Sequence, residues 1–122
     1  MRLTKEAIVT AQDIITQEVD VPEWGGVVEV RRLSAYERMA FRNTVISKAG
    51  DDVNVDTQRA QILLVAMAMS DPVMSEDELG AKAAVALDRV YRVAADLNGM
   101  TDKAVEEMVK NSETPSTSSA TD

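Results

Sequence analysis

The stretch 21-VPEWGGVVEV-30 decides how the first part of this 122-residue chain folds. It holds Trp24, the only tryptophan, and two of the five glycines. Apolar and polar residues alternate before it, in 14-IITQEVDV-21, and again after it, in 27-VVEVRRL-33. Period-2 alternation is typical of half-buried strands, and Pro and Gly between two such runs indicate a turn. We therefore predict an antiparallel β-hairpin at 14–33 with a five-residue loop, Pro-Glu-Trp-Gly-Gly.

The remainder of the chain predicts helices. Capping boxes at Ser34–Glu37 and Ser75–Glu78 begin two of them, and Gly50 and Gly99 are natural helix stops. The predicted helices span 5–12, 34–50, 57–69, 75–98 and 102–110, with a loop at 51–56. The helix at 57–69 is apolar on almost every side and should be central, while the last long helix has an apolar stripe at Ala83, Leu87, Val90, Ala94 and Leu97.

These elements make up a mainly α (α+β) protein. The expected organisation is one helical domain at 1–110, with the small N-terminal hairpin, followed by a tail at 111–122. The tail is rich in Ser and Thr and has no large apolar residue, so it predicts disorder.

Composition excludes many kinds of chemistry. The chain has no Cys and no His, which removes disulfides, thiolate and imidazole catalysis and the usual zinc sites. The loop 51-DDVNVD-56 has part of the calcium-loop spacing, but Thr57 and Leu63 stand where that loop needs Gly and Glu. We expect no catalytic residues, no metal, no cofactor and no enzyme activity. The net charge of −8 argues against nucleic-acid binding, and the longest apolar run, 60–69, is too short to span a membrane.

Charge is distributed unevenly. The segment from Arg31 to Lys48 contains five basic residues and one acid, a local charge of +4. The rest of the chain therefore carries −12, which gives the net charge of −8. This segment is either a solvated helix face or a basic patch for an acidic partner, including another copy of the chain. The hairpin likewise has two readings. In one, Trp24 caps the end of the helical core, on which Val19, Val21, Val28 and Val30 pack; in the other, Trp24 anchors a contact made by an exposed strand edge.

A resemblance to a known family rests on the order of these elements. It runs from about Leu3 to Asn111 and is most specific in the Val-Pro-Glu-Trp-Gly-Gly hairpin. Around the hairpin stand Leu-Ser-x-x-Glu-Arg at 33–38, Ser-Glu-Asp-Glu-Leu at 75–79 and Leu-Asn-Gly at 97–99. With this pattern the chain resembles the tail assembly chaperones of long-tailed, non-contractile bacteriophages.

The resemblance implies a function in binding. Such chaperones coat and solubilise the tape measure protein in the host cytoplasm, recruit tail tube subunits, self-associate and are absent from the mature virion. Many are made in two lengths by ribosomal frameshifting, and this chain looks like the short form, with 109–111 as the expected slippage site. The rival predictions are a structural head–tail connector or tail terminator of the virion, and a small acidic regulator or DNA mimic.

The predicted partner-binding residues fall in two groups. One follows from the solitary tryptophan and the hairpin, and the other from the basic segment. They are Trp24, Gly25, Gly26, Val28 and Val30 in the first group, and Arg31, Arg38 and Arg42 in the second.

Overall fold

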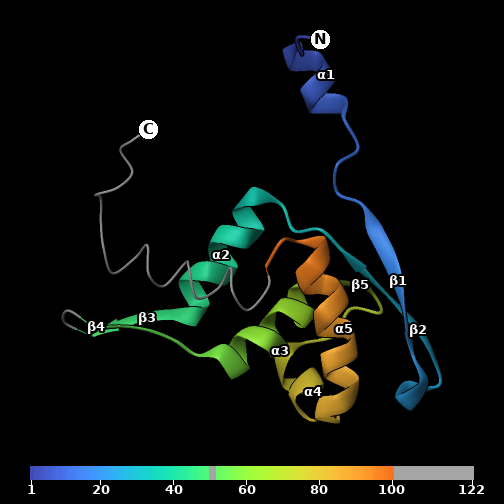
Figure 1. Ribbon diagram of the computed structural model, residues 1–122, viewed down its shortest axis with the longest axis vertical. Coiled ribbons are helices and arrows are strands. Elements are labelled where there is room, and N and C mark those ends of the chain that lie inside the picture. Colours follow the sequence, from blue (N-terminus) through green and yellow to red (C-terminus); the bar gives the residue numbers. More distant parts are fainter. Residues whose placement is uncertain (50–51, 101–122) are drawn as a thin grey trace.

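The computed structural model describes residues 1–49 and 52–100, without the side chains of 47–49 and 52–55. Its elements are helices and short strands (Figure 1). They are α1 (Lys5–Thr10), β1 (Thr16–Val21), the 3-10 turn η1 (Pro22–Trp24), β2 (Gly26–Arg31), α2 (Ala35–Val45), β3 (Ile46–Ala49), β4 (Asp52–Val55), α3 (Thr57–Ala68), β5 (Met69–Asp71), α4 (Glu76–Gly80) and α5 (Ala84–Leu97). This confirms the mixed α+β fold with an antiparallel hairpin near the N-terminus.

The hairpin forms where the sequence predicts it. β1 and β2 pair in register from Thr16↔Arg31 to Val21↔Gly26. This pairing leaves a loop of four residues instead of five, because Gly26 already belongs to the second strand. Gly25 lies in the left-handed region (φ 80°), and its N–H donates to the carbonyl of Val21 at 3.1 Å. A residue with φ > 0 and no Cβ penalty is what such a tight closure needs.

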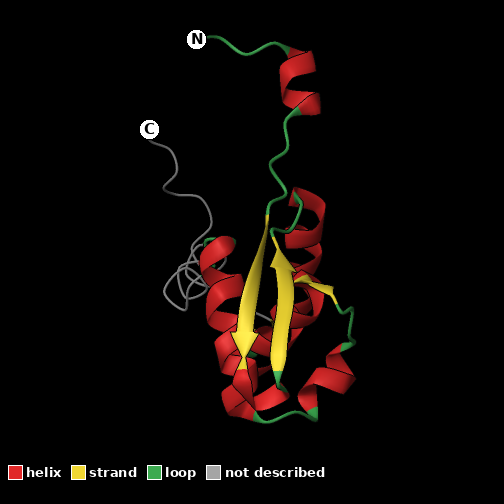
Figure 2. Cartoon of the chain, turned by 90° about the vertical axis from the view of Figure 1, so that its right-hand side faces the viewer, coloured by secondary structure: helices red, strands yellow, loops and turns green. Residues whose placement is uncertain are grey.

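The inner face of the sheet covers the helices. Val19, Val21, Val28 and Val30 are buried on it, whereas Ile15 lies just before β1 and is exposed. The sheet lies in front of the helices in Figure 2, and no helix of the described residues covers its outer face. α3 is the central helix, as predicted, since it contacts α2, α4, α5, β2 and β5.

The sheet has a third strand that the sequence pattern does not reveal. β5 pairs with β2 at Glu29↔Asp71 and Val30↔Met69, giving the order β1-β2-β5. Met69 ends the apolar helical run and the polar Ser70 and Asp71 follow it, so no alternation marks the strand. Their extended conformation is fixed by pairing with a distant strand, which local sequence does not encode.

The helix predicted at 34–50 is too long by several residues, whereas those predicted at 5–12 and 57–69 end two residues and one residue early. The helix expected at 34–50 ends at Val45, and the chain continues into the β3–β4 hairpin, where we predicted the end of a helix and a loop. β-Branched residues such as Ile46, Val53 and Val55 favour strands, and that preference prevails over the helical pattern. The N–H of Asp56 donates to the carbonyl of Val45 and closes this hairpin.

The helix expected at 75–98 is broken into α4 and α5. α4 ends at Gly80, and Ala83 is extended (φ −61°, ψ 133°) before α5 begins. Gly is a poor helix former, and the break lets Leu79 of α4 enter the core independently of α5. α5 then buries Leu87, Val90 and Ala94, as their spacing predicts, and it stops before Gly99 (φ 64°). The predictions for 102–110 and for the tail 111–122 lie outside the described residues.

Candidate interaction surface

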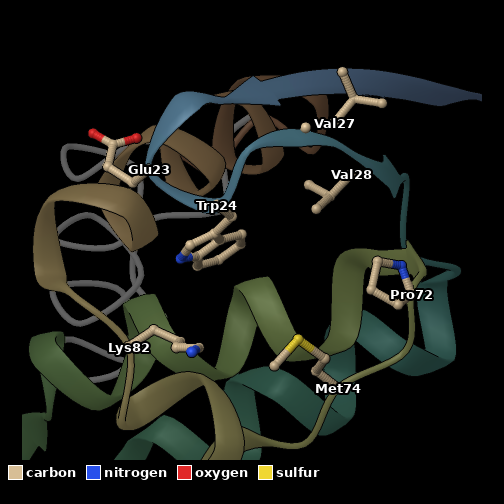
Figure 3. A pocket seen from close by; sticks show the side chains of 8 residues that line it. Glu23, Trp24, Val27, Val28, Pro72, Met74 and Lys82 are labelled. Atoms are coloured by element: carbon tan, nitrogen blue, oxygen red, sulfur yellow. The ribbon is translucent and has the colours of Figure 1, made fainter.

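Trp24 belongs both to the core and to a surface groove. Its half-buried side chain packs against the buried core cluster. The ring also lines a groove of about 480 Å³, which we call the Trp24 groove. Trp24 and Val28 point from the hairpin toward Met74 and Lys82 on the opposite wall (Figure 3). The two readings of Trp24 are therefore compatible, because one part of the ring packs against the core while another part lines the groove.

The walls of the Trp24 groove come from segments far apart in sequence. The hairpin supplies Glu23, Trp24, Gly26, Val27 and Val28, and the opposite wall is made by Pro72, Met74 and Lys82. Sequence reasoning missed this second wall. Its only signal was the helix-breaking dipeptide Asp71-Pro72, which indicates a surface turn but not which segment lies opposite that turn.

The hairpin loop is fixed on α5. Glu23 accepts a charged hydrogen bond from Arg89 at 2.8 Å. That hydrogen bond lowers the pKa of Glu23 and raises the pKa of Arg89. Trp24 is thus presented from an anchored turn, and Gly26 lines the groove beside it while Gly25 shapes the turn. A preorganised aromatic side chain is a suitable binding anchor because less entropy is lost on contact.

Two of the predicted binding residues belong to the core. Val28 is 7% exposed and Val30 is fully buried. Both point inward from β2, since the pairing register puts them on the face that covers the helices. We correct their assignment: Val30 is unavailable to a partner, and Val28 contributes only the part of its side chain that lines the groove.

Arg31 is also engaged within the chain. Its guanidinium donates to both carboxylate oxygens of Glu37, at 2.8 and 2.7 Å, and to the carbonyl of Met67 at 3.3 Å. This bidentate pair, with help from the N–H of Ser34, lowers the pKa of Glu37 to about 2. The pair joins the end of β2 to the start of α2. Arg31 is therefore a structural residue and not part of a free basic patch.

Arg38 and Arg42 do form an exposed basic patch. They lie one turn apart on α2 with Met39 between them, around a shallow hollow of about 610 Å³. Met39 is 53% exposed and Tyr36, on the same helix, is 82% exposed. Within the described part of the chain neither arginine takes part in an ion pair. We call this surface, made by Tyr36, Arg38, Met39 and Arg42, the α2 face; it combines positive charge with apolar area.

The outer face of the sheet is acidic. Glu18 stands opposite Glu29, and Glu29 stands opposite Asp71, so three carboxylates form a row across the strands. With Asp20 we call this surface the acidic sheet face. Ser70 donates to Glu29 at 2.7 Å and offsets part of the repulsion.

The acids also affect the free edge of the sheet. β1 is an edge strand and pairs, among the described residues, only with β2. Antiparallel pairing of this edge with β1 of another copy would bring Glu18 and Asp20 of one strand close to those of the other. Charges at an edge are a common means of preventing such pairing. The β1 edge is therefore a poor contact between copies at neutral pH.

No metal centre is evident in the described ranges 1–49 and 52–100. They contain no group of Asp and Glu residues arranged to hold a metal ion. Nor is any helix in those ranges long and apolar enough to cross a membrane. Comparisons of the chain with protein-family models, with curated proteins and with solved structures find no match.

Proposed function

We propose that this chain is a tail assembly chaperone of long-tailed, non-contractile bacteriophages, acting by binding and not by catalysis. It coats and solubilises the tape measure protein in the host cytoplasm and recruits tail tube subunits. It is absent from the finished virion. The resemblance centred on the Val-Pro-Glu-Trp-Gly-Gly hairpin motivates this proposal.

The α2 face is the structural observation that carries the proposal. A long helical client prone to aggregation needs a partner that covers apolar stripes of varied sequence. Met39 is flexible and polarizable, which suits such variable surfaces. Arg38 and Arg42 flank it and would pair with acids beside the apolar stripe of a client helix. The remaining negative charge of the chain keeps the resulting complex soluble.

Co-expression with tape measure fragments tests this function. The wild-type chain should keep the fragments soluble and co-purify with them. Reversal of both charges, Arg38→Glu with Arg42→Glu, should lower the recovered soluble fragment at least tenfold. Arg92→Glu is the control, because Arg92 is an exposed arginine on another helix, α5. Equal recovery with wild type and the double variant would exclude the α2 face as the client site.

The composition of purified virions separates the proposal from its main rival. A chaperone should be undetectable in mature particles by mass spectrometry, whereas a head–tail connector or tail terminator would be present at a fixed copy number. Detection of the chain in virions would reject the chaperone function whatever the co-expression result.

A further inference from the structure

The N-terminal arm, residues 1–15, is bonded to its own domain where it joins the hairpin, but its helix α1 lies apart from the core. α1 stands away from the other helices and strands of the described residues (Figure 1), and none of its residues is buried. Leu3, Ile8 and Val9 are 63%, 60% and 73% exposed. A six-residue helix is far too short to be stable alone in water. Exposed apolar side chains on such a helix indicate that another surface covers it.

The arm is directed away from its own Trp24 groove. The N–H of Arg32 donates to the carbonyl of Ile15 at 3.0 Å, and its guanidinium donates to the carbonyl of Asp13 at 3.4 Å. These bonds prolong the hairpin beyond Thr16, so the arm leaves at the open end. The Trp24 loop is at the other end of the six-residue strand, roughly 20 Å away. Ile8 is five residues from Asp13, a reach of at most about 18 Å, so it does not reach that groove while these bonds hold.

The Trp24 groove has the properties of a receptor for such an arm. Its volume of about 480 Å³ lies within the roughly 300–1,000 Å³ range of binding pockets. Trp24, Val28, Pro72 and Met74 provide apolar walls. β5 pairs with β2 only at Glu29 and Val30. Alternation along the ladder therefore directs the N–H and C=O of Val27 toward the groove, where they can bind a peptide backbone.

The start of the arm is complementary in charge to the acidic sheet face. The arm holds two basic residues, Arg2 and Lys5, on either side of Leu3, and two acids, Glu6 and Asp13, further along. The acidic sheet face adjoins the groove, since Asp20 stands directly opposite Val27 in the hairpin register. With residues 2–5 at this rim, Arg2 and Lys5 would meet its carboxylates, which favours one orientation of the arm.

We propose that the N-terminal arm of one copy docks in the Trp24 groove of a second copy. Leu3, Ile8 and Val9 pack against the apolar walls, while Arg2 and Lys5 face the acidic sheet face. Donor and receptor are different surfaces, so the contact is heterologous and links copies head to tail. It concerns contacts between copies and stands apart from tape measure binding, which we assign to the α2 face.

Directed disulfide formation tests the contact. The chain has no native cysteine, so single substitutions report single positions. A mixture of Ile8→Cys and Lys82→Cys chains should form a covalent heterodimer under mild oxidation. A mixture of Ile8→Cys with Val85→Cys is the control, because Val85 is exposed but does not line the groove. Absence of an excess of heterodimer over this control would overturn the proposal.

The double variant Ile8→Cys/Lys82→Cys distinguishes docking between copies from docking within one. At low protein concentration it should remain reduced, and at high concentration it should form covalent oligomers. A monomer closed by an internal disulfide at every concentration would show that the arm occupies its own groove, which contradicts the proposal.

Association of the unmodified chain gives an independent measurement. Trp24 is the only tryptophan, so its emission should shift to the blue as copies associate and cover the groove. Ile8→Asp should raise the dissociation constant at least tenfold, both in this signal and in sedimentation velocity. Val85→Asp adds the same charge at an exposed site and should leave it unchanged. An unchanged constant with Ile8→Asp would overturn the proposal even if tape measure binding persists.

Discussion

The role of Arg31 can be assigned only when its neighbours in the structure are known. In the sequence it belongs to a basic segment that indicates a partner surface. In the structure its charge is directed inward to Glu37, and the pair closes the corner between β2 and α2. Sequence separation of six residues hides this contact, because a strand, a turn and a capping box must form before the two groups meet.

Glu37→Gln should destabilise the fold in a pH-dependent way. The folded pKa of Glu37 is lowered from 4.5 to about 2, so its contribution is complete above pH 4.5 and is lost as the pH falls toward 2. Because both side chains are partly exposed, we expect a loss of only about 1 kcal/mol in the free energy of unfolding at pH 7. The loss should shrink as the pH is lowered from 4.5 to 2 in urea titrations.

Glu78→Gln is the matched control for this effect. Glu78 occupies the same capping-box position in α4, and it is not in any ion pair found among the described residues. A pH-dependent loss of equal size in both variants would show that the cap, and not Arg31, is responsible.

Gly25→Ala should isolate the cost of the hairpin turn. Gly25 has φ 80°, and a Cβ there would meet nothing within 4 Å. The penalty is therefore conformational, about 1–2 kcal/mol for a left-handed residue. Gly26→Ala is matched, because its Cβ also meets nothing within 4 Å but its φ is ordinary, and it should be neutral. Equal unfolding free energies for the two variants would contradict the role of the left-handed turn.

At the scale of elements, the hairpin depends on α5 at both of its ends. The Glu23–Arg89 pair holds the loop end. At the open end, Asn98 accepts from the N–H of Leu33 at 2.7 Å and donates to the carbonyl of Arg31 at 3.3 Å. A two-stranded hairpin is marginal alone, and these contacts and the buried valines keep it on the helices.

Asn98→Ala should detach the open end of the hairpin. It leaves the partly buried N–H of Leu33 without its acceptor, at a cost of about 1–3 kcal/mol in the free energy of unfolding. Hydrogen exchange of the β2 amides should increase more than that of α3. Asn43→Ala, at an exposed site on α2, should change stability by less than about 0.5 kcal/mol. If Asn98→Ala behaves like Asn43→Ala, the contact does not hold the hairpin.

For the whole molecule, the sequence predicts local structure better than relations between distant segments. The hairpin, the capping boxes at Ser34 and Ser75 and the apolar α3 follow from short patterns and are confirmed. β5 and the far wall of the Trp24 groove depend on contacts between segments some 40 residues or more apart, as in the pairing of Glu29 with Asp71. No short pattern encodes such contacts.

The candidate surfaces show the same division. Exposure of Arg38 and Arg42 follows from the polar positions of an amphipathic helix, so this part was predictable. The alternation in β2 predicts that Val28 and Val30 share one face of the hairpin. That this face covers the helices follows only from the position of α5. A helix was predicted within the arm, at 5–12, and α1 lies there, yet its separation from the domain appears only when the core is assembled without it.

The contacts between the hairpin and α5 have a consequence for synthesis on the ribosome. Glu23 and Arg89 are 66 residues apart in the chain. At roughly 5–20 residues per second, the translated hairpin waits about 3–13 s before α5 has been made. During that interval the nascent chain has Val19, Val21, Val28 and Val30 but not the helix that covers them. The acids on the other face of the sheet repel those of hairpins emerging from neighbouring ribosomes. This repulsion disfavours aggregation before α5 has been made.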